Sequence, residues 1–290
     1  MLRHFWITLK RTLWAWNDHE APRLGAALSF YTMLSLAPLV ILVIAIASLV
    51  FGHSAAQNEI IRQVQGIMGA EGAKAVETVI AHGQKPTGVF ASVIGVITLL
   101  VGASGAFSEL QSALNKIWGV QPNNGGFVAS LVKARLFSFG MVLAVGFLLL
   151  VSLIITAGLA VLGKFFGEIL PMPELLMHVI NFLVSFAGIS ALFALIFKYV
   201  PEAKIGWKDV WEGALVTALL FTIGKSLIGL YLGKAAVGSA YGAAGSLIVV
   251  IVWIYYSALI FFFGAEFAHV RATGRQVQER RAPRANDALR

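Results

Sequence analysis

The sequence predicts an all-α integral membrane protein with six transmembrane helices. Of its 290 residues, 58% are hydrophobic and only 12% are charged, whereas soluble domains carry about 25% charged residues. Several stretches also reach the ~20 apolar residues that a helix needs to cross a bilayer. The clearest of them runs without a charge from Leu247 to Phe263. We therefore expect a single membrane domain over residues 1–272.

The N-terminal segment, residues 2–19, predicts an amphipathic helix. Arg3, Lys10 and Arg11 lie away from its apolar face on a helical wheel. Basic residues and tryptophans on a weakly hydrophobic helix are typical of one that lies in the headgroup region of a membrane. Packing on the protein's own loops is an equally open alternative. The apolar residues, at spacings of three and four, are Leu2, Phe5, Trp6, Leu9, Leu13 and Trp16.

The first span has a semi-polar half that contains Tyr31 and Ser35. Pro38 follows, and because proline has no amide hydrogen it leaves the Leu34 carbonyl without its helical partner. Inside a membrane such a carbonyl needs protein or water as a partner, so this half is expected to face protein or a cavity. The six spans are expected at about residues 26–51, 88–107, 136–162, 175–199, 209–232 and 246–270.

The interval between the first two spans, residues 52–88, is the longest polar one. Two stretches with helical spacing flank residues 66–72, which predicts a short helical cap. The second span has small residues that allow close helix packing, and its helix is expected to continue through 108–118, where Glu109 lies. The polar, arginine-rich residues 273–290 are expected to form a disordered cytoplasmic tail.

The distribution of basic residues predicts the orientation. Residues 1–25, the 108–135 loop, the 198–208 turn and the residues from Arg271 onward hold sixteen Lys and Arg, and the opposite loops hold five. Cytoplasmic loops carry the excess of Lys and Arg. Both termini are therefore expected in the cytoplasm, and the cap over 52–88 outside it.

The sequence indicates no catalytic, cofactor or metal site. There is no cysteine, and no two of the six histidines are three or four residues apart, as helical zinc ligands would be. The candidates are ionisable residues in or near the spans, because charge there is costly and marks function by default. Glu212 and Glu266 either reach the interface, accept hydrogen bonds from neighbouring helices, or gate a path. Lys225 either snorkels to the interface or faces an anionic ligand.

A second candidate is the small-residue connection before the last span. It contains Tyr241, Gly242 and Gly245. Small residues there allow either close packing or movement, and both alternatives remain open. The mechanism we expect is a substrate cavity that movement of this connection opens. The residues bounding the cavity would be Tyr31, Ser35, Glu212, Lys225 and Glu266.

Four stretches together resemble the YihY/BrkB family of bacterial inner-membrane proteins, historically also labelled ribonuclease BN-like. The resemblance covers nearly the whole chain up to about Ala272. The stretches are AALSFYTMLSLAPL (Ala26–Leu39), SGAFSELQSALNKIWGV (Ser104–Val120), FKYVPEAKIGWKDVWEGALVTALLF (Phe197–Phe221) and YGAAGSLIVVIVWIYYSALIFFFGAEFAHV (Tyr241–Val270).

This resemblance implies a six-helix protein of the bacterial inner membrane but no agreed reaction. Transport or export of a lipid, or of another hydrophobic or anionic solute, is the function that we expect. The alternative is a scaffold that recruits an envelope protein partner through residues 52–88 or the tail. An embedded enzyme is not expected. Membrane lipids are the expected partners and nucleic acid is not, because arginines without interleaved aromatics beside a membrane favour lipid headgroups. The oligomeric state is left open.

Overall fold

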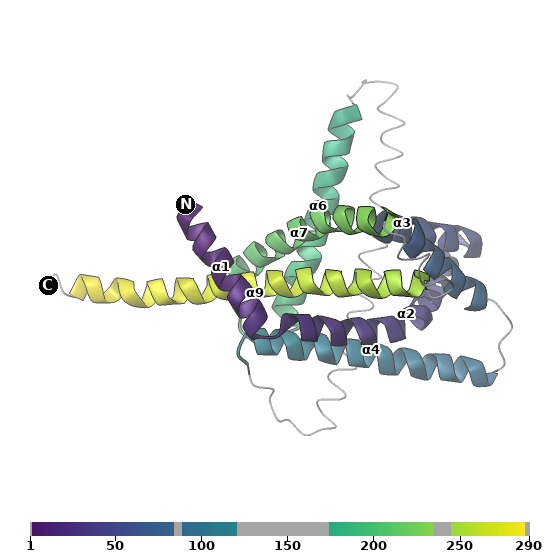
Figure 1. Cartoon of the computed structure of the whole chain (residues 1–290), viewed down its shortest axis with the longest axis horizontal. Helices are drawn as coiled ribbons and strands as arrows, with labels where there is room; N and C mark the ends of the chain where they lie inside the picture. Colours follow the sequence, from purple (N-terminus) through teal and green to yellow (C-terminus); the bar gives the residue numbers. More distant parts are fainter. Residues whose placement is uncertain (1, 84–88, 121–173, 235–244, 288–290) are drawn as a thin grey trace.

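The computed structural model describes residues 2–83, 89–120, 174–234 and 245–287, and every regular element in these ranges is an α-helix. The predicted all-α class is therefore confirmed for this part of the chain. Figure 1 shows the helices, which are α1 (Leu2–Asp18), α2 (Ala21–Phe51), α3 (His53–Gly83), α4 (Val89–Ile117), α6 (Glu174–Tyr199), α7 (Trp207–Lys234) and α9 (Gly245–Asp287).

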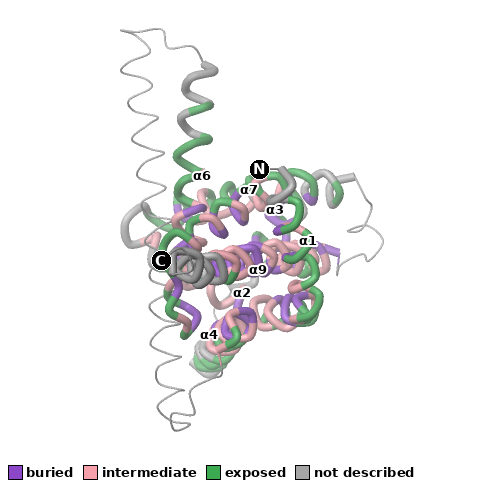
Figure 2. Tube along the Cα trace, turned by 90° about the vertical axis from the view of Figure 1, so that its left-hand side faces the viewer, coloured by how far each residue is buried: buried purple, intermediate pink, exposed green. Residues whose placement is uncertain are grey.

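The last helix, α9, is the centre of the arrangement. It contacts α1, α2, α3, α4 and α7, and seen nearly end-on it lies among them (Figure 2). Its uncharged stretch supplies the apolar surface for this role, since Val249, Val250 and Phe262 are fully buried. The helix that is most apolar in sequence is thus the one that the others surround.

Within the described ranges, four helical segments are long and apolar enough to cross a membrane: Ala21–Ala45, Phe182–Tyr199, Trp207–Ile228 and Gly245–Arg275. They coincide with four of the predicted spans. Residues 89–107 of the span predicted at 88–107 lie in α4, which continues to Ile117 as expected. The predicted span at 136–162 lies outside the described residues. The chain is therefore a membrane protein with several candidate spans, and the count of six stays a prediction.

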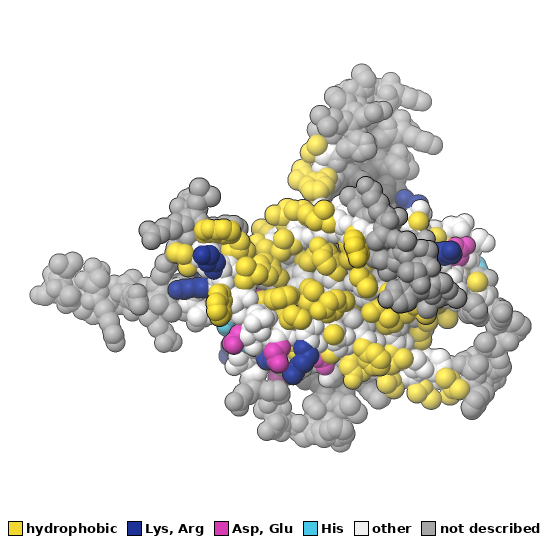
Figure 3. All heavy atoms as spheres, viewed as in Figure 1, with side chains coloured by type: hydrophobic (Ala, Val, Ile, Leu, Met, Phe, Trp, Pro, Cys, Tyr) yellow, Lys and Arg dark blue, Asp and Glu magenta, His cyan; other side chains and the backbone are white. Residues whose placement is uncertain are grey.

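The outer surface agrees with a membrane environment. Figure 3 shows hydrophobic side chains over the middle of the visible face and charged side chains towards its two ends. The axes of α2, α4, α7 and α9 lie roughly side by side in Figure 1, with α2 and α7 antiparallel to α4 and α9, whereas α6 crosses them and its first half projects outward. Such an exposed apolar belt is far larger than a soluble protein tolerates.

The inward face of α1 differs from the expected one. Thr8 and Thr12 are its buried residues, against α9, while Trp6 and Trp14 are 60% and 79% exposed. Small threonines allow α1 and α9 to approach closely, and the Thr12 hydroxyl is satisfied by the Thr8 carbonyl at 2.9 Å. The amphipathic helix therefore packs on the protein through Thr8, Thr12 and Trp16 and exposes Trp6 and Trp14.

Residues 53–83 form α3, which is broken at Gly69. Gly69 has φ 78°, a conformation that glycine adopts without the steric cost of a Cβ. The break separates two helical stretches, within the 66–72 region where the sequence predicted a separation. The second stretch packs Val76 and Ile80 against Val40 and Ile44 of α2. The α3 segment thus closes the end of the bundle where α2 ends and α4 begins (Figure 1).

Pro38 lies inside α2, as expected, and the helix extends from Ala21 to Phe51. The last helix, α9, continues to Asp287, through most of the residues expected to form a disordered tail. Extending an existing helix adds one hydrogen bond for each residue that is ordered, and the Gln, Glu, Arg and Ala residues of this segment are good helix formers.

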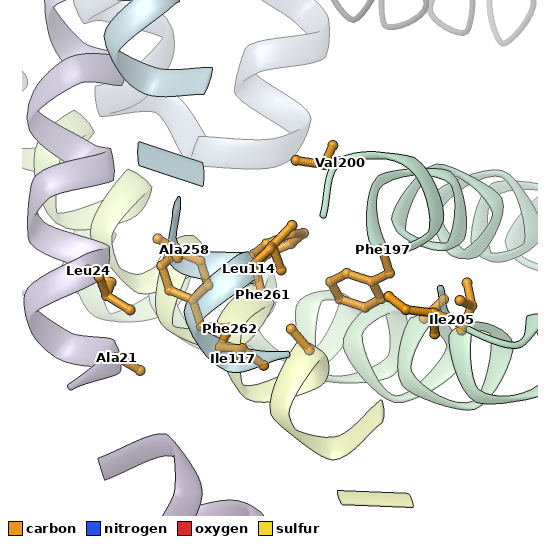
Figure 4. Packing of buried hydrophobic residues seen from close by; sticks show 14 of the residues in the cluster. Ala21, Leu24, Leu114, Ile117, Phe197, Val200, Ile205, Ala258, Phe261 and Phe262 are labelled. Atoms are coloured by element: carbon orange, nitrogen blue, oxygen red, sulfur yellow. The ribbon is translucent and has the colours of Figure 1, made fainter. Parts of the chain in front are cut away.

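The main hydrophobic core lies at the other end of the bundle from α3. Figure 4 shows side chains from α2, α4, α6, the turn after α6, and α9 converging there. Its largest fully buried members include Leu114, Phe197 and Phe262. Phe197 and Phe261 have ring centroids 5.0 Å apart. This core holds the ends of five helices together next to the polar residues described below.

Candidate functional site

A left-handed turn between α1 and α2 begins the site. Glu20 has φ 57° and ψ 40°, and a non-glycine residue pays roughly 1 kcal/mol for this conformation. The turn directs two consecutive side chains to different helices. His19 reaches α9, where it contacts Glu266, and Glu20 reaches α4, where its carboxylate accepts a hydrogen bond from Lys116 at 2.9 Å.

The central feature is the pair formed by His19 and Glu266. His19 Nδ1 lies 2.6 Å from Glu266 Oε1. The Glu266 side chain is fully buried, whereas that of His19 is 26% exposed. The proton between the two atoms can lie on the imidazole or on the carboxyl. The His19 imidazole reaches solvent, whereas the Glu266 carboxyl does not. The imidazole can therefore carry a proton between solvent and the carboxyl.

The second carboxyl oxygen, Glu266 Oε2, is buried and has no hydrogen-bond partner among the residues that the structure describes. Buried polar atoms are almost always paired, so such an oxygen is unusual. It can accept a proton or face a cation or a water. The site therefore contains one buried hydrogen-bond acceptor for which the described residues provide no donor.

A second histidine lies on the same face of α9 as Glu266. His269 comes three residues after Glu266, and residues so spaced share a helix face. The Trp118 ring, just after α4, meets the His269 ring edge-on, with centroids 5.1 Å apart. The Trp16 indole donates to the Leu259 carbonyl of α9 at 3.4 Å. These contacts join α1 and the end of α4 to α9.

Ion pairs connect α7 and α9 at the same end. Arg271 Nε lies 2.7 Å from Glu212 Oε2, and Arg275 Nη2 lies 2.7 Å from Asp209 Oδ1 and 2.9 Å from Glu212 Oε1. Glu212 thus accepts a hydrogen bond from Arg271 and forms an ion pair with Arg275, one turn further along α9. Its role in this structure is to hold α7 on α9.

Glu20 forms a smaller pair at the surface. The hydrogen bond from Lys116 and the charge of Arg23 hold the pKa of Glu20 below its usual value. Because Glu20 is solvated, we regard this pair as a positional contact between α4 and the turn rather than as a large source of stability.

The predicted residues of the first span are packed against α4. A Cβ placed on Gly105 would lie 2.3 Å from the Tyr31 ring, and one on Gly102 would lie 2.9 Å from Ser35. Ser35 is buried and donates to the Thr32 carbonyl at 3.0 Å. Both residues therefore occupy close contacts between α2 and α4, which would have to separate before a cavity could open there.

The other predicted residues are spread over the bundle. Glu109 is half-buried in α4 and Lys225 is half-buried in α7. Gly245 is the buried first residue of α9. Tyr241 and Gly242 lie outside the described residues. The structure thus brings only Glu266 and Glu212 into side-chain networks, and within the described ranges no three metal-binding side chains are grouped for a metal ion.

Three important residues were not predicted: His19, His269 and Arg275. The only signal for His19 is its position just before the first span. His269 was visible as an i+3 neighbour of Glu266, a pattern that becomes informative only when the helix face is known to be buried.

Comparison with known proteins settles the family. The sequence model described as Virulence factor BrkB matches residues 12–289. The chain belongs to the BrkB family. The resemblance seen in the four sequence stretches is thereby confirmed.

Curated relatives align over most of the same residues. A UPF0761 membrane protein of Verminephrobacter eiseniae is 28% identical, over 90% of this chain and 61% of its own length. The one from Mannheimia succiniciproducens is 26% identical, over 88% and 85%. The ribonuclease-like protein YfkH of Bacillus subtilis is 23% identical, over 89% and 92%. The chain spans about three-fifths of the length of the Verminephrobacter relative and of its Pseudomonas counterparts, at 61% and 62%. No solved structure matches.

Proposed function

We propose that this BrkB-family chain is a membrane transporter or lipid-translocating protein that moves a hydrophobic or anionic substrate without altering it chemically. The observation that carries the proposal is the fully buried Glu266, paired with His19 inside a candidate span. Ionisable groups within membrane helices are costly and mark functional positions by default. Apolar residues of similar volume often stabilise such a position as well or better. If the pair served stability alone, apolar residues would serve as well, so its ionisable groups favour a functional role.

The pair also suits a role in coupling. A proton or cation arriving at Glu266 Oε2 would change how strongly the carboxyl holds His19. The turn between α1 and α2 would then be held more or less tightly on α9. Movement of α2 relative to α4 would take the Tyr31 ring out of its contact with Gly105 and Ser35 out of its contact with Gly102. We infer that protonation at Glu266 and separation of α2 from α4 are linked steps of transport.

The proposal is tested in liposomes. The purified chain should raise lipid scrambling or anion flux above that of empty liposomes, and a pH difference across the membrane should change the rate. Glu266→Gln keeps the shape but cannot ionise, so most of the rate increase and its response to pH should be lost. Glu77→Gln, at an exposed position of α3, is the matched control and should behave as wild type. Wild-type rates equal to those of empty liposomes across several lipids and anions would contradict transport.

We further propose that the chain crosses the bacterial inner membrane six times, with both termini in the cytoplasm. The end of the bundle with α1, Lys116 and Arg271 would then face the cytoplasm, and α3 would lie outside it. This orientation follows the excess of basic residues at that end. It also puts Glu266 near the cytoplasmic side of α9.

Cysteine labelling checks the orientation, and the natural chain has no cysteine to interfere. Asn17 and Lys74 are exposed in α1 and α3. In spheroplasts, a membrane-impermeant maleimide should label Lys74→Cys at once and Asn17→Cys only after the membrane is disrupted. Labelling of Asn17→Cys before disruption, with Lys74→Cys protected, would reverse the proposed orientation.

A further inference from the structure

The exposed ridge of α7 has the dimensions of a lipid-facing surface. Every fourth residue from Trp211 to Tyr231 is a large apolar side chain that is 42% to 60% exposed. At 1.5 Å per residue this ridge is ~30 Å long, which equals the ~30 Å hydrocarbon thickness of a bilayer. Both of its ends are aromatic and its middle is aliphatic. Trp and Tyr are enriched at the two membrane interfaces, so Trp211 marks the level of one interface.

Immediately beyond Trp211, the turn between α6 and α7 holds an aromatic and basic cluster. Tyr199 and Trp207 are 55% and 46% exposed, with ring centroids 6.2 Å apart and edge-on. Lys198 Nζ lies 5.5 Å from the centre of the Trp207 ring and donates to the Ile205 carbonyl. An ammonium has three donors, so two of them remain for another acceptor. The turn holds the cluster in place, and the two rings are exposed on the surface of the protein.

The charge of this turn is positive. Lys204 and Lys208 are exposed on it, beside Lys198. Asp209 is engaged by Arg275 at 2.7 Å, and the other acid of the turn, Glu202, is exposed. The Glu202 amide donates to Asn115 Oδ1 at 2.8 Å, which ties this turn to the end of α4. Three lysines and one exposed acid, Glu202, thus lie at the level of the phospholipid headgroups.

We propose that this turn binds the headgroup of an anionic phospholipid, with Lys198, Lys204 and Lys208 around the phosphate and Trp207 and Tyr199 at the glycerol level. The acyl chains would lie along the ridge of α7. Lysines are effective phosphate binders as point charges, and tryptophan is stable where one side is apolar and the other is wet. The inference depends on membrane insertion and not on transport.

Native mass spectrometry of the purified full chain tests the proposal. Phosphatidylglycerol should be retained in preference to phosphatidylcholine with the same acyl chains. Each lysine near an anionic membrane surface contributes about fivefold to binding, so Lys204→Gln/Lys208→Gln should weaken phosphatidylglycerol binding by about 25-fold. Lys10→Gln/Lys74→Gln removes the same charge from exposed positions elsewhere and should leave binding within about twofold of wild type.

A measurement on the wild-type chain avoids any effect of substitution on folding. In nanodiscs, acylation of Lys204 and Lys208 should be slower with phosphatidylglycerol than with phosphatidylcholine, while acylation of Lys74 should not change. Equal retention of the two lipids, or an equal loss in the control variant, would overturn the proposal in favour of diffuse charge attraction. Displacement of the lipid by inorganic phosphate at the same concentration would instead indicate a site for a free anion and would also overturn it.

Discussion

Gly264→Ala is expected to lower the free energy of unfolding by about 1–3 kcal/mol, the usual cost of inserting a methyl group into a close-packed contact. The added Cβ would lie 1.7 Å from the Thr217 hydroxyl and 2.8 Å from its Cβ. Thr217 is fully buried and its hydroxyl is bonded to the Gly213 carbonyl at 2.7 Å, so it has no free space into which to turn. α7 and α9 would have to move apart. Thermal unfolding in detergent measures the change.

Gly274→Ala is the matched control for this substitution. It lies in the same helix, and a Cβ there meets nothing within 4 Å. Alanine is favoured over glycine in a helix by about 0.8–1 kcal/mol, so this variant should be as stable as wild type or slightly more stable. Thr217→Ala should recover part of the stability lost in Gly264→Ala. If Gly264→Ala were as stable as Gly274→Ala, the contact between α7 and α9 at Thr217 would be wrong.

His19→Ala is expected to destabilise the protein by about 3 kcal/mol at neutral pH, because it leaves a buried carboxylate without its partner. Glu266→Gln combined with His19→Ala should restore most of the loss, since a neutral amide does not carry an uncompensated charge. The effects of the two substitutions should therefore be strongly non-additive. A double-mutant cycle by chemical or thermal unfolding measures this coupling.

The pH provides a second check on the pair. Lowering the pH should reduce the cost of His19→Ala, because protonation of Glu266 removes the unpaired charge. Glu20→Gln is the control, since its pair with Lys116 is exposed to solvent and should contribute little to stability. Additive effects of His19→Ala and Glu266→Gln, with no dependence on pH, would show that the two residues do not interact.

Some features of the site were accessible from local sequence. Glu212 and Glu266 stand out because each is an acid in an apolar stretch, and one of the alternatives considered for them, hydrogen bonding to neighbouring helices, is what the structure shows. Their partners were not accessible. The pair of His19 and Glu266 joins residues 247 positions apart. The pair of Arg271 and Glu212 joins residues 59 apart. No periodicity within a single helix encodes such distances.

For the faces of the helices too, local sequence predicts that a face packs closely, but not which residues it contacts. The glycines of the span at 88–107 predicted close packing, and Gly102 does approach α2. That its contact is Ser35, rather than another residue of α2, depends on the relative height of the two helices. In α1 the apolar periodicity identified the amphipathic helix, yet the buried side is formed by Thr8 and Thr12. In a membrane the apolar side can face lipid, so hydrophobicity alone does not say which side faces protein.

The sequence by itself determined the helical membrane class, the positions of the most apolar helices and the family, because these depend on composition and local periodicity. The tertiary structure decided that α9 is central, that His19 meets Glu266, and that two arginines hold Glu212. The physical reason is that each of these contacts requires a particular rotation and height of one helix relative to another. Close packing at Gly102, Gly105 and Gly264 sets those two quantities, and the packing involves the whole bundle at once.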